Sequence, residues 1–176
     1  MLGLHGGIST AAKPDRILKS NLYTFESETT GWTAHSVQGT LTLQAGQSAP
    51  GSSDSDWMKC TFDTNQDDGN SGITTGNGWI DEVKVGDILD VSYDIHVVDD
   101  SGKWGTDPPV SFRCQFAGTA PTNNVALDTT VINESYQITA NTTGRFVAIE
   151  VNNTPDRPQA GAVFYIRNIR LTLRRP

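Results

Sequence analysis

Apolar and polar residues alternate over most of this 176-residue chain, in short runs separated by turn-forming residues. In the clearest run, the odd positions from Leu89 to Val97 are apolar and the even positions from Asp90 to His96 are polar. Because successive side chains of a strand point to opposite faces, this run predicts an antiparallel strand with one buried face and one face in water. The same alternation predicts strands around Leu41 and Leu43; Met58, Cys60 and Phe62; Val110, Phe112, Cys114 and Phe116; Tyr136, Ile138 and Ala140; and Val147, Ile149 and Val151.

The last run changes phase in its middle. Its apolar positions are even from Ala162 to Ile166 and odd from Ile169 to Leu173. One extra residue near Arg167-Asn168 accounts for the change, so a β-bulge is predicted there. No long segment has a helical period. The pattern therefore predicts an all-β fold, an antiparallel β-sandwich or jelly roll of about eight or more strands.

The first twenty residues differ from the rest of the chain. Leu2, Leu4 and Ile8 alternate with glycines, and a single helical turn is the most that residues 14–18 are expected to form. The segment lacks the basic start and unbroken apolar run of an export signal. We expect residues 1–20 to be an extended N-terminal arm that contacts a partner, and residues 21–176 to be the sandwich domain. Packing of the arm on its own domain is the alternative.

Composition narrows the range of functions. The hydrophobic content is 36% and the net charge is −7, with 20 acidic against 13 basic residues. Phosphate backbones attract clustered cations, so this balance argues against nucleic-acid binding. No apolar stretch approaches the ~20 residues needed to cross a bilayer, so no membrane partner is expected. The last strand carries four arginines, which are interpreted as alternating outward and balancing nearby acids: Arg167, Arg170, Arg174 and Arg175.

Short motifs carry a family resemblance. Phe25-Glu26 followed by Gly31-Trp32 resembles the opening of jelly-roll carbohydrate-binding modules of the galactose-binding-like kind. Residues 85–93, 136–139 and 164–173 are similar to later strands of these modules, so the likeness covers about residues 22–173. The resemblance implies the fold, and sugar binding is only suggested by it, since fold does not determine function. A structural calcium is common in the family, but the dipeptide at the corresponding place is Arg167-Asn168, whose cation opposes calcium.

The arm resembles a different class. A Met-Leu-Gly-Leu start with glycines before a compact sandwich looks like small virion proteins of tailed bacteriophages, in particular head decoration (cement) proteins. The resemblance implies a homotrimer on the capsid, with the arm holding the major capsid protein, and a virion location after synthesis in the host cytoplasm. We assign Leu2, Leu4 and Ile8 as apolar anchors and Arg16 or Lys19 as contacts with an acidic partner surface.

Aromatic side chains are the basis of a second hypothesis, glycan binding. Pyranose rings stack on flat aromatic faces, and Trp57, Trp79 and Trp104 are the candidates for a glycan platform or for a subunit interface. Trp57 has the polar parity of its strand, and Trp104 lies in a loop between Lys103 and Gly105, so both rings are expected to be exposed. The main hypothesis is therefore a capsid decoration protein; the alternative is a carbohydrate-binding module used in adsorption or in a polysaccharide-acting assembly.

The residues carry no pattern for catalysis, a cofactor or a metal. His5, His35 and His96 have no metal-ligand spacing, and no Gly-x-Ser-x-Gly motif occurs. The Asp-rich stretch 63–69 differs from a calcium loop, because its glycine is one place late and Thr74 stands where the bidentate Glu belongs. We predict that the chain is not an enzyme and binds no cofactor. Cys60 and Cys114 have apolar parity and are expected as free core thiols, with a bridge as the alternative.

Overall fold

The structure of the chain is a computed structural model that describes residues 14–35, 40–66, 71–76, 78–98, 102–104, 110–116, 122–125, 129–140, 142–151 and 158–176. Thirteen strands and no helix occur in these ranges, which confirms the all-β prediction. None of these residues belongs to a helix long and apolar enough to span a bilayer.

Most of the strands are short, and four of them, β1, β7, β10 and β13, have eight residues or more. They are β1 (Arg16–Tyr23), β2 (Thr33–His35), β3 (Leu41–Gln47), β4 (Trp57–Phe62), β5 (Ser71–Thr74), β6 (Ile80–Val83), β7 (Ile88–Val97), β8 (Val110–Gln115), β9 (Thr122–Val125), β10 (Thr129–Gln137), β11 (Thr142–Arg145), β12 (Ala148–Val151) and β13 (Val163–Arg175).

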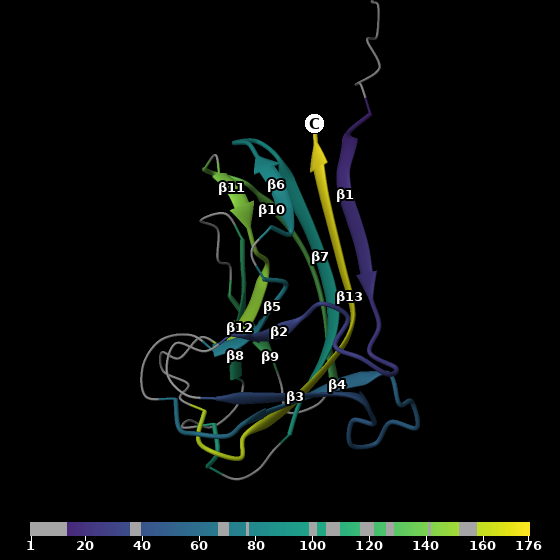
Figure 1. Cartoon of the computed structure of the whole chain (residues 1–176), viewed down its shortest axis with the longest axis vertical. Helices are drawn as coiled ribbons and strands as arrows, with labels where there is room; N and C mark the ends of the chain where they lie inside the picture. Colours follow the sequence, from purple (N-terminus) through teal and green to yellow (C-terminus); the bar gives the residue numbers. More distant parts are fainter. Residues whose placement is uncertain are drawn as a thin grey trace, which may run out of the picture.

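Two large antiparallel sheets form the sandwich. The six-stranded sheet has the order β10-β7-β13-β4-β3, and β1 also pairs with β13; the five-stranded sheet has the order β2-β5-β12-β8-β9. A two-stranded sheet of β11 and β6 accompanies them. The long strands β7, β13 and β1 run side by side along one side of the molecule in Figure 1, and β12, β5 and β8 lie on the other side. The sandwich predicted from the alternation is therefore confirmed.

The core lies between the two sheets and is rich in aromatic rings. Phe164 of β13 contacts Phe112 of β8 edge to face, with ring centroids 5.2 Å apart, and so joins the two sheets. Phe62 of β4 packs on Phe164 and on Trp104. Fully burying such a ring stabilises a fold by roughly 1.5–3 kcal/mol relative to leaving it in water. The residues predicted to point inward from β4, β7 and β8 are all buried.

The predicted bulge in the last strand is confirmed. The pairing of β13 with β7 shifts register between Arg167 and Arg170, and Asn168 adopts a φ of 52°. The extra residue lets Ile166 and Ile169 both face the core although three positions separate them. A left-handed conformation is unusual for a side chain other than glycine, and Asn is among the residues that tolerate it best. Arg167 follows the buried Ile166, so by alternation it faces the outer side of the sheet.

The expected boundary after residue 20 falls inside β1. Residues 16–23 pair with residues 169–175 of β13 in the same chain. No helical turn forms over residues 14–18, where at most one turn is expected. A register shift between Ile17 and Lys19 brings Lys19 opposite Leu173, whose side chain is buried. Residues 1–13 lie outside the described ranges.

Both cysteines are buried and free, as expected. Cys60 lies on β4 and Cys114 on β8. Burial raises the pKa of Cys60 well above its ordinary value and that of Cys114 to about 12. Because thiols react as thiolates, these two side chains are inert core residues near neutral pH.

Candidate functional site

A buried carboxylate lies on the outer side of the five-stranded sheet. Val147, Ile149 and Val151 face the core, so by alternation Glu150 of β12 points away from it. Yet Glu150 is only 1% exposed. Its neighbours across the sheet are Gly72 of β5 and Arg113 of β8, and Gly72 in turn pairs with His35 of β2. His35, Glu150 and Arg113 therefore form one polar row across four strands.

The carboxylate of Glu150 is held from both sides. Nε of Arg113 donates to Oε2 at 2.9 Å, and Nε2 of His35 lies 2.9 Å from Oε1. Burial alone raises the pKa of Glu150, but the hydrogen bonds from His35 and Arg113 outweigh it, so that this pKa is lowered. The hydrogen bond with Glu150 raises the pKa of His35 above its ordinary value, although burial opposes this. The row thus contains a permanent anion, a permanent cation and one group that titrates near neutral pH.

Gly72 is required where β5 passes β12. A Cβ at this position would lie 2.1 Å from the carbonyl oxygen of Ile149 and 2.7 Å from Cα of Glu150. Real atoms do not approach so closely, so any side chain would push the two strands apart. The missing side chain also leaves His35 and Glu150 as neighbours across β5. Gly72 therefore contributes to the row by leaving the space between its members free.

Two further side chains extend the row into a surface. The ring of Phe146, which precedes β12, lies 5.8 Å from the ring of His35 at an interplanar angle of 36°. The amide oxygen of Gln115 lies 3.5 Å from Nη2 of Arg113. His35, Phe146, Arg113 and Gln115 are all partly exposed, whereas Glu150 beneath them is not. We call these five residues the Glu150 surface. It presents hydrogen-bonding groups beside a half-exposed aromatic ring.

The six-stranded sheet carries a cluster of opposite sign on its outer side. Arg167 of β13 donates through Nη1 to Asp54 at 2.8 Å and to Asp56 at 2.9 Å, and through Nε to Asp94 at 3.1 Å. Its guanidinium lies 4.4 Å from the ring centroid of Trp57. Burial alone lowers the pKa of Arg167, but the three carboxylates outweigh it and raise this pKa further above its ordinary range. A cation of the protein therefore occupies the point where the carboxylates converge.

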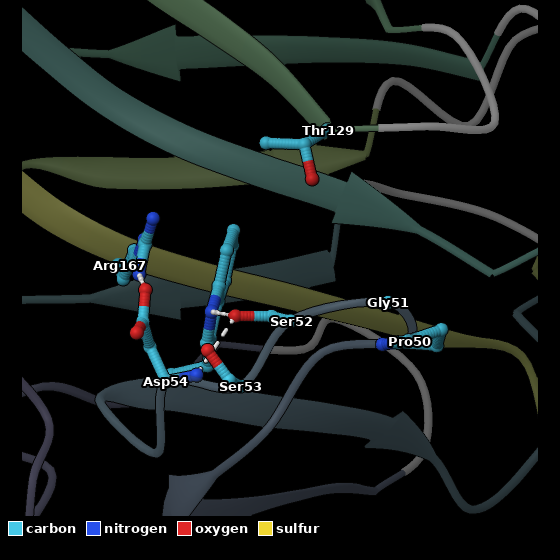
Figure 2. A pocket seen from close by; sticks show the side chains of 8 residues that line it. Pro50, Gly51, Ser52, Ser53, Asp54, Thr129 and Arg167 are labelled. Atoms are coloured by element: carbon cyan, nitrogen blue, oxygen red, sulfur yellow. Dashed lines mark hydrogen bonds and ion pairs between the residues drawn. The ribbon is translucent and has the colours of Figure 1, made fainter.

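A pocket of about 320 Å³ adjoins this cluster. Figure 2 shows Arg167 on one side of it, Thr129 at the start of β10 on another, and the segment Pro50–Asp54 opposite. Oγ of Ser52 accepts the backbone N–H of Asp54 and the indole N–H of Trp57, at 3.1 and 3.3 Å. The bond from Trp57 ties the segment to β4, and the bond from Asp54 holds the turn within the segment.

The residues expected to contact a partner divide into two groups. Leu2, Leu4 and Ile8 lie outside the described residues. Arg16 is exposed at the start of β1. Lys19 is partly buried: Nζ donates to the carbonyl oxygen of Trp79 and lies 5.3 Å from the centroid of its ring.

The tryptophans expected to be exposed are buried. Trp57, Trp79 and Trp104 are 1%, 5% and 3% exposed, so the prediction that Trp57 and Trp104 present free rings is wrong. Trp57 does have the outward parity of its strand, but Arg167 and Ser52 cover it. Trp104 donates to the carbonyl of Val98 and packs on Phe62 and Phe112, and Trp79 donates to Tyr23. Parity identifies the face of a sheet, and it does not show what lies over that face.

The histidines and the acidic stretch show no metal centre in the described part of the chain. No group of three metal-binding side chains occurs there. His96 faces outward on β7, as expected, but is buried rather than wet, beneath Thr129 and Tyr165. Asp63 accepts a hydrogen bond from Thr42, and residues 67–70 of the Asp-rich stretch lie outside the described ranges.

Sequence reasoning missed the Glu150 surface. Glu150 follows the alternation of its strand, so its position predicted an exposed acid like many others. His35 and Arg113 are distant from it in the sequence, and only the strand order β2-β5-β12-β8 brings the three together. The one local signal is Gly72, because a glycine inside a strand often marks a close approach of another backbone.

No protein-family model matches the sequence, and no curated protein does. Solved structures do resemble it. One is the CBM22-1 xylan-binding domain of Xyn10C from Paenibacillus barcinonensis, with 17% identity and a TM-score of 0.52 over 94% of this chain and 99% of that one. The CBM22-1-CBM22-2 tandem of the same protein gives 17% identity and a TM-score of 0.56 over 96% of this chain and 48% of the tandem.

A third structure contains the CBM22-1 and GH10 modules of xylanase 10B from Clostridium thermocellum, complexed with xylohexaose. It is 15% identical, with a TM-score of 0.53 over 86% of this chain and 28% of that one. This chain thus spans about half of the tandem and less than a third of the xylanase chain. At these identities the likeness establishes the fold, which is that of carbohydrate-binding jelly-roll domains.

Proposed function

We propose that this chain is a non-catalytic carbohydrate-binding domain that binds a glycan on the Glu150 surface. The observation that carries the proposal is the burial of Glu150 on the solvent side of its strand, between Arg113 and His35. Removing a carboxylate from water is costly, and a hydrophobic residue of similar size often gives equal or greater stability. A buried ionic group at this place therefore suggests a role in recognition.

Glu150 acts as a positioning residue in this proposal. It is too buried to contact a ligand directly, but it orients Arg113 and His35, whose side chains are 22% and 32% exposed. The planar guanidinium offers several donors in a rigid arrangement, and the imidazole offers one more. Side chains that are already oriented lose less conformational entropy when a ligand binds. The row therefore suits the repeated hydroxyls of a sugar chain.

Phe146 supplies the apolar contact. Its ring is partly exposed and lies beside His35 at the edge of the row. A pyranose ring has a C–H face that packs on such a ring, and the hydroxyls of further units of the chain would meet Arg113 and Gln115. A few polar groups beside an apolar contact is the usual composition of a small-ligand site. The xylan-binding neighbours make β-1,4-linked xylose chains the first glycan to test.

Calorimetric titration with xylohexaose, followed by an array of other neutral glycans, tests the proposal. We expect Glu150→Gln to weaken binding by about tenfold, because the neutral amide no longer orients two cations. Glu82→Gln is the matched control, since Glu82 is an exposed acid on β6 whose ion pair with Lys84 lies in water. Arg113→Lys should weaken binding as well, because an ammonium lacks the planar fork.

Two results contradict the proposal. One is the absence of binding to every glycan by the intact chain. The other is equal affinity of the wild-type protein and the Glu150→Gln variant for the glycan that binds, with both proteins folded by circular dichroism.

The capsid decoration hypothesis stays a prediction. It depends on Leu2, Leu4 and Ile8, which lie outside the described residues. The solved structures given above are carbohydrate-binding domains, alone or joined to a xylanase module. No feature of the described residues favours binding to a capsid or formation of a trimer.

A further inference from the structure

We propose that the pocket beside Arg167 is a second ligand site, and that it takes a neutral polyhydroxylated unit such as a single sugar residue. This site is independent of the proposed function. It lies on the outer side of the six-stranded sheet, whereas the Glu150 surface belongs to the five-stranded sheet. A ligand in the pocket would therefore leave the Glu150 surface open.

Size limits the ligand. The volume of about 320 Å³ lies at the lower end of the ~300–1,000 Å³ typical of ligand pockets. The lining consists of Pro50, Gly51, Ser52, Ser53, Asp54, Trp57, Thr129 and Arg167. Such a space suits one or two sugar residues better than a long chain lying across a sheet.

The lining offers donors and acceptors side by side. Oγ of Ser52 accepts two hydrogen bonds from the protein, so its own hydroxyl hydrogen remains for a ligand. Ser53 is exposed, and Oδ1 of Asp54 remains as an acceptor because Arg167 binds Oδ2. Nη2 of Arg167 has no acceptor among the described residues. Sugar hydroxyls both donate and accept, so they match this mixture.

A third hydroxyl completes the lining from the other side. Oγ1 of Thr129 lies 3.1 Å from Nδ1 of His96, which holds the side chain in place. Figure 2 shows this hydroxyl pointing toward the pocket, across from Ser52 and Ser53. Hydroxyls fixed on opposite sides of a pocket give a polyol more than one direction of contact.

Charge selects a neutral ligand over an anion. Arg167 contributes one positive charge, and Asp54, Asp56 and Asp94 contribute three negative ones. The formal sum is 1 − 3 = −2, so a phosphate, sulfate or uronate would be repelled despite the arginine. Two of the three guanidinium nitrogens of Arg167, Nε and Nη1, already donate to these carboxylates. The pocket therefore differs from an anion site, although it contains a guanidinium.

The test is a two-dimensional amide NMR titration of the full chain with D-xylose, D-glucose and D-galactose, and with D-glucuronate as the anionic comparison. We expect at least one neutral sugar to shift the amides of Ser53, Asp54 and Thr129 and the indole signal of Trp57, with affinity in the millimolar range. Ser53→Tyr fills the pocket from an exposed position and should weaken this binding by about tenfold or more. Thr129→Val, which keeps the shape but removes the hydroxyl, should weaken it by about fivefold.

Glu150→Gln separates this inference from the proposed function. The variant should bind in the pocket as the wild type does, because Glu150 lies on the other sheet. Shifts confined to His35, Arg113 and Phe146 would overturn the pocket proposal and leave the proposed function intact. Absence of pocket shifts with all three neutral sugars, or glucuronate binding as tightly as glucose, would also overturn it.

Discussion

The outer faces of the two sheets carry ionic clusters built with opposite signs. On the five-stranded sheet a carboxylate, Glu150, lies between the guanidinium of Arg113 and the imidazole of His35. On the six-stranded sheet a guanidinium, Arg167, lies among three carboxylates. Glu150 is covered by its partners, so a ligand meets Arg113 and His35 instead. Arg167 stays 20% exposed and lines the pocket together with Asp54.

The difference between the clusters affects both ligand choice and response to pH. The Glu150 cluster presents cationic donors and sums to zero or +1, depending on the protonation of His35. The Arg167 cluster presents acceptors and sums to −2. Only the first contains a histidine, whose pKa its carboxylate partner raises above the ordinary value of 6.5. The two faces should therefore respond differently to charge, salt and pH.

The largest loss of stability is expected from a substitution that disturbs the packing beneath the Glu150 surface. Gly72→Ala should destabilise the protein by about 3 kcal/mol, because its Cβ would meet the backbone of Ile149 at 2.1 Å. Urea unfolding followed by tryptophan fluorescence measures the change. Thr33→Ala, on the neighbouring edge strand β2, is the control and should change stability little. A loss below 1 kcal/mol (about the smallest cost of overpacking) would contradict the close approach of β5 and β12.

Removing the central anion should have the next largest effect. Glu150→Ala should cost about 2 kcal/mol, since it leaves Arg113 and His35 without their shared counter-charge. The cost is reduced because both cations retain partial contact with water. Thermal unfolding at low and high salt measures it, and Glu82→Ala is the exposed control. Unchanged stability would mean that the row does not hold its members together.

Removing the central cation of the other cluster should lower the stability of the fold by a smaller amount. Arg167→Ala should cost about 1 kcal/mol, because its carboxylates are partly in water and Asp54 is 59% exposed. Arg170→Ala on the same strand is the matched control, since Arg170 is exposed and has no ion pair among the described residues. Added salt should reduce the loss caused by Arg167→Ala, because salt screens the remaining carboxylates. Equal effects of the two substitutions would contradict the cluster.

The smallest effect is the pH dependence of the Glu150 cluster. The pKa of His35 is higher in the folded state than its ordinary value of 6.5. Protonated His35 therefore stabilises the fold fully below about pH 6.5, and this contribution is lost as pH rises through the raised pKa. The difference in melting temperature between wild type and His35→Gln should shrink from pH 6 to pH 8, and it should correspond to ~1 kcal/mol or less because the imidazole is partly exposed. A difference that grows with pH would contradict the pairing.

Local pattern explains why so much of the fold was predictable. Alternation needs only neighbouring residues, and it identified the inward side chains of β4, β7, β8 and β13, including the bulge at Arg167-Asn168. It failed for β1, where no clear alternation precedes Leu22 and pairing with β13 supplies the structure. Tertiary pairing decides such strands, and a single sequence does not display it.

The candidate sites could not be predicted from the sequence for the same reason. Whether Trp57 is exposed depends on Arg167, which is far away in the sequence. Whether Glu150 is buried depends on His35 and Arg113 arriving from β2 and β8. Parity placed Trp57 and Glu150 outward correctly, but the cover over an outward side chain comes from other strands and loops.

The most direct test of the central claim is an amide NMR map of the full chain with xylohexaose or the best glycan found. We predict that the largest shifts fall on His35, Arg113 and Phe146, and that Glu150→Gln removes them. Shifts concentrated on strands of the six-stranded sheet, with the outer face of the five-stranded sheet unperturbed, would contradict it.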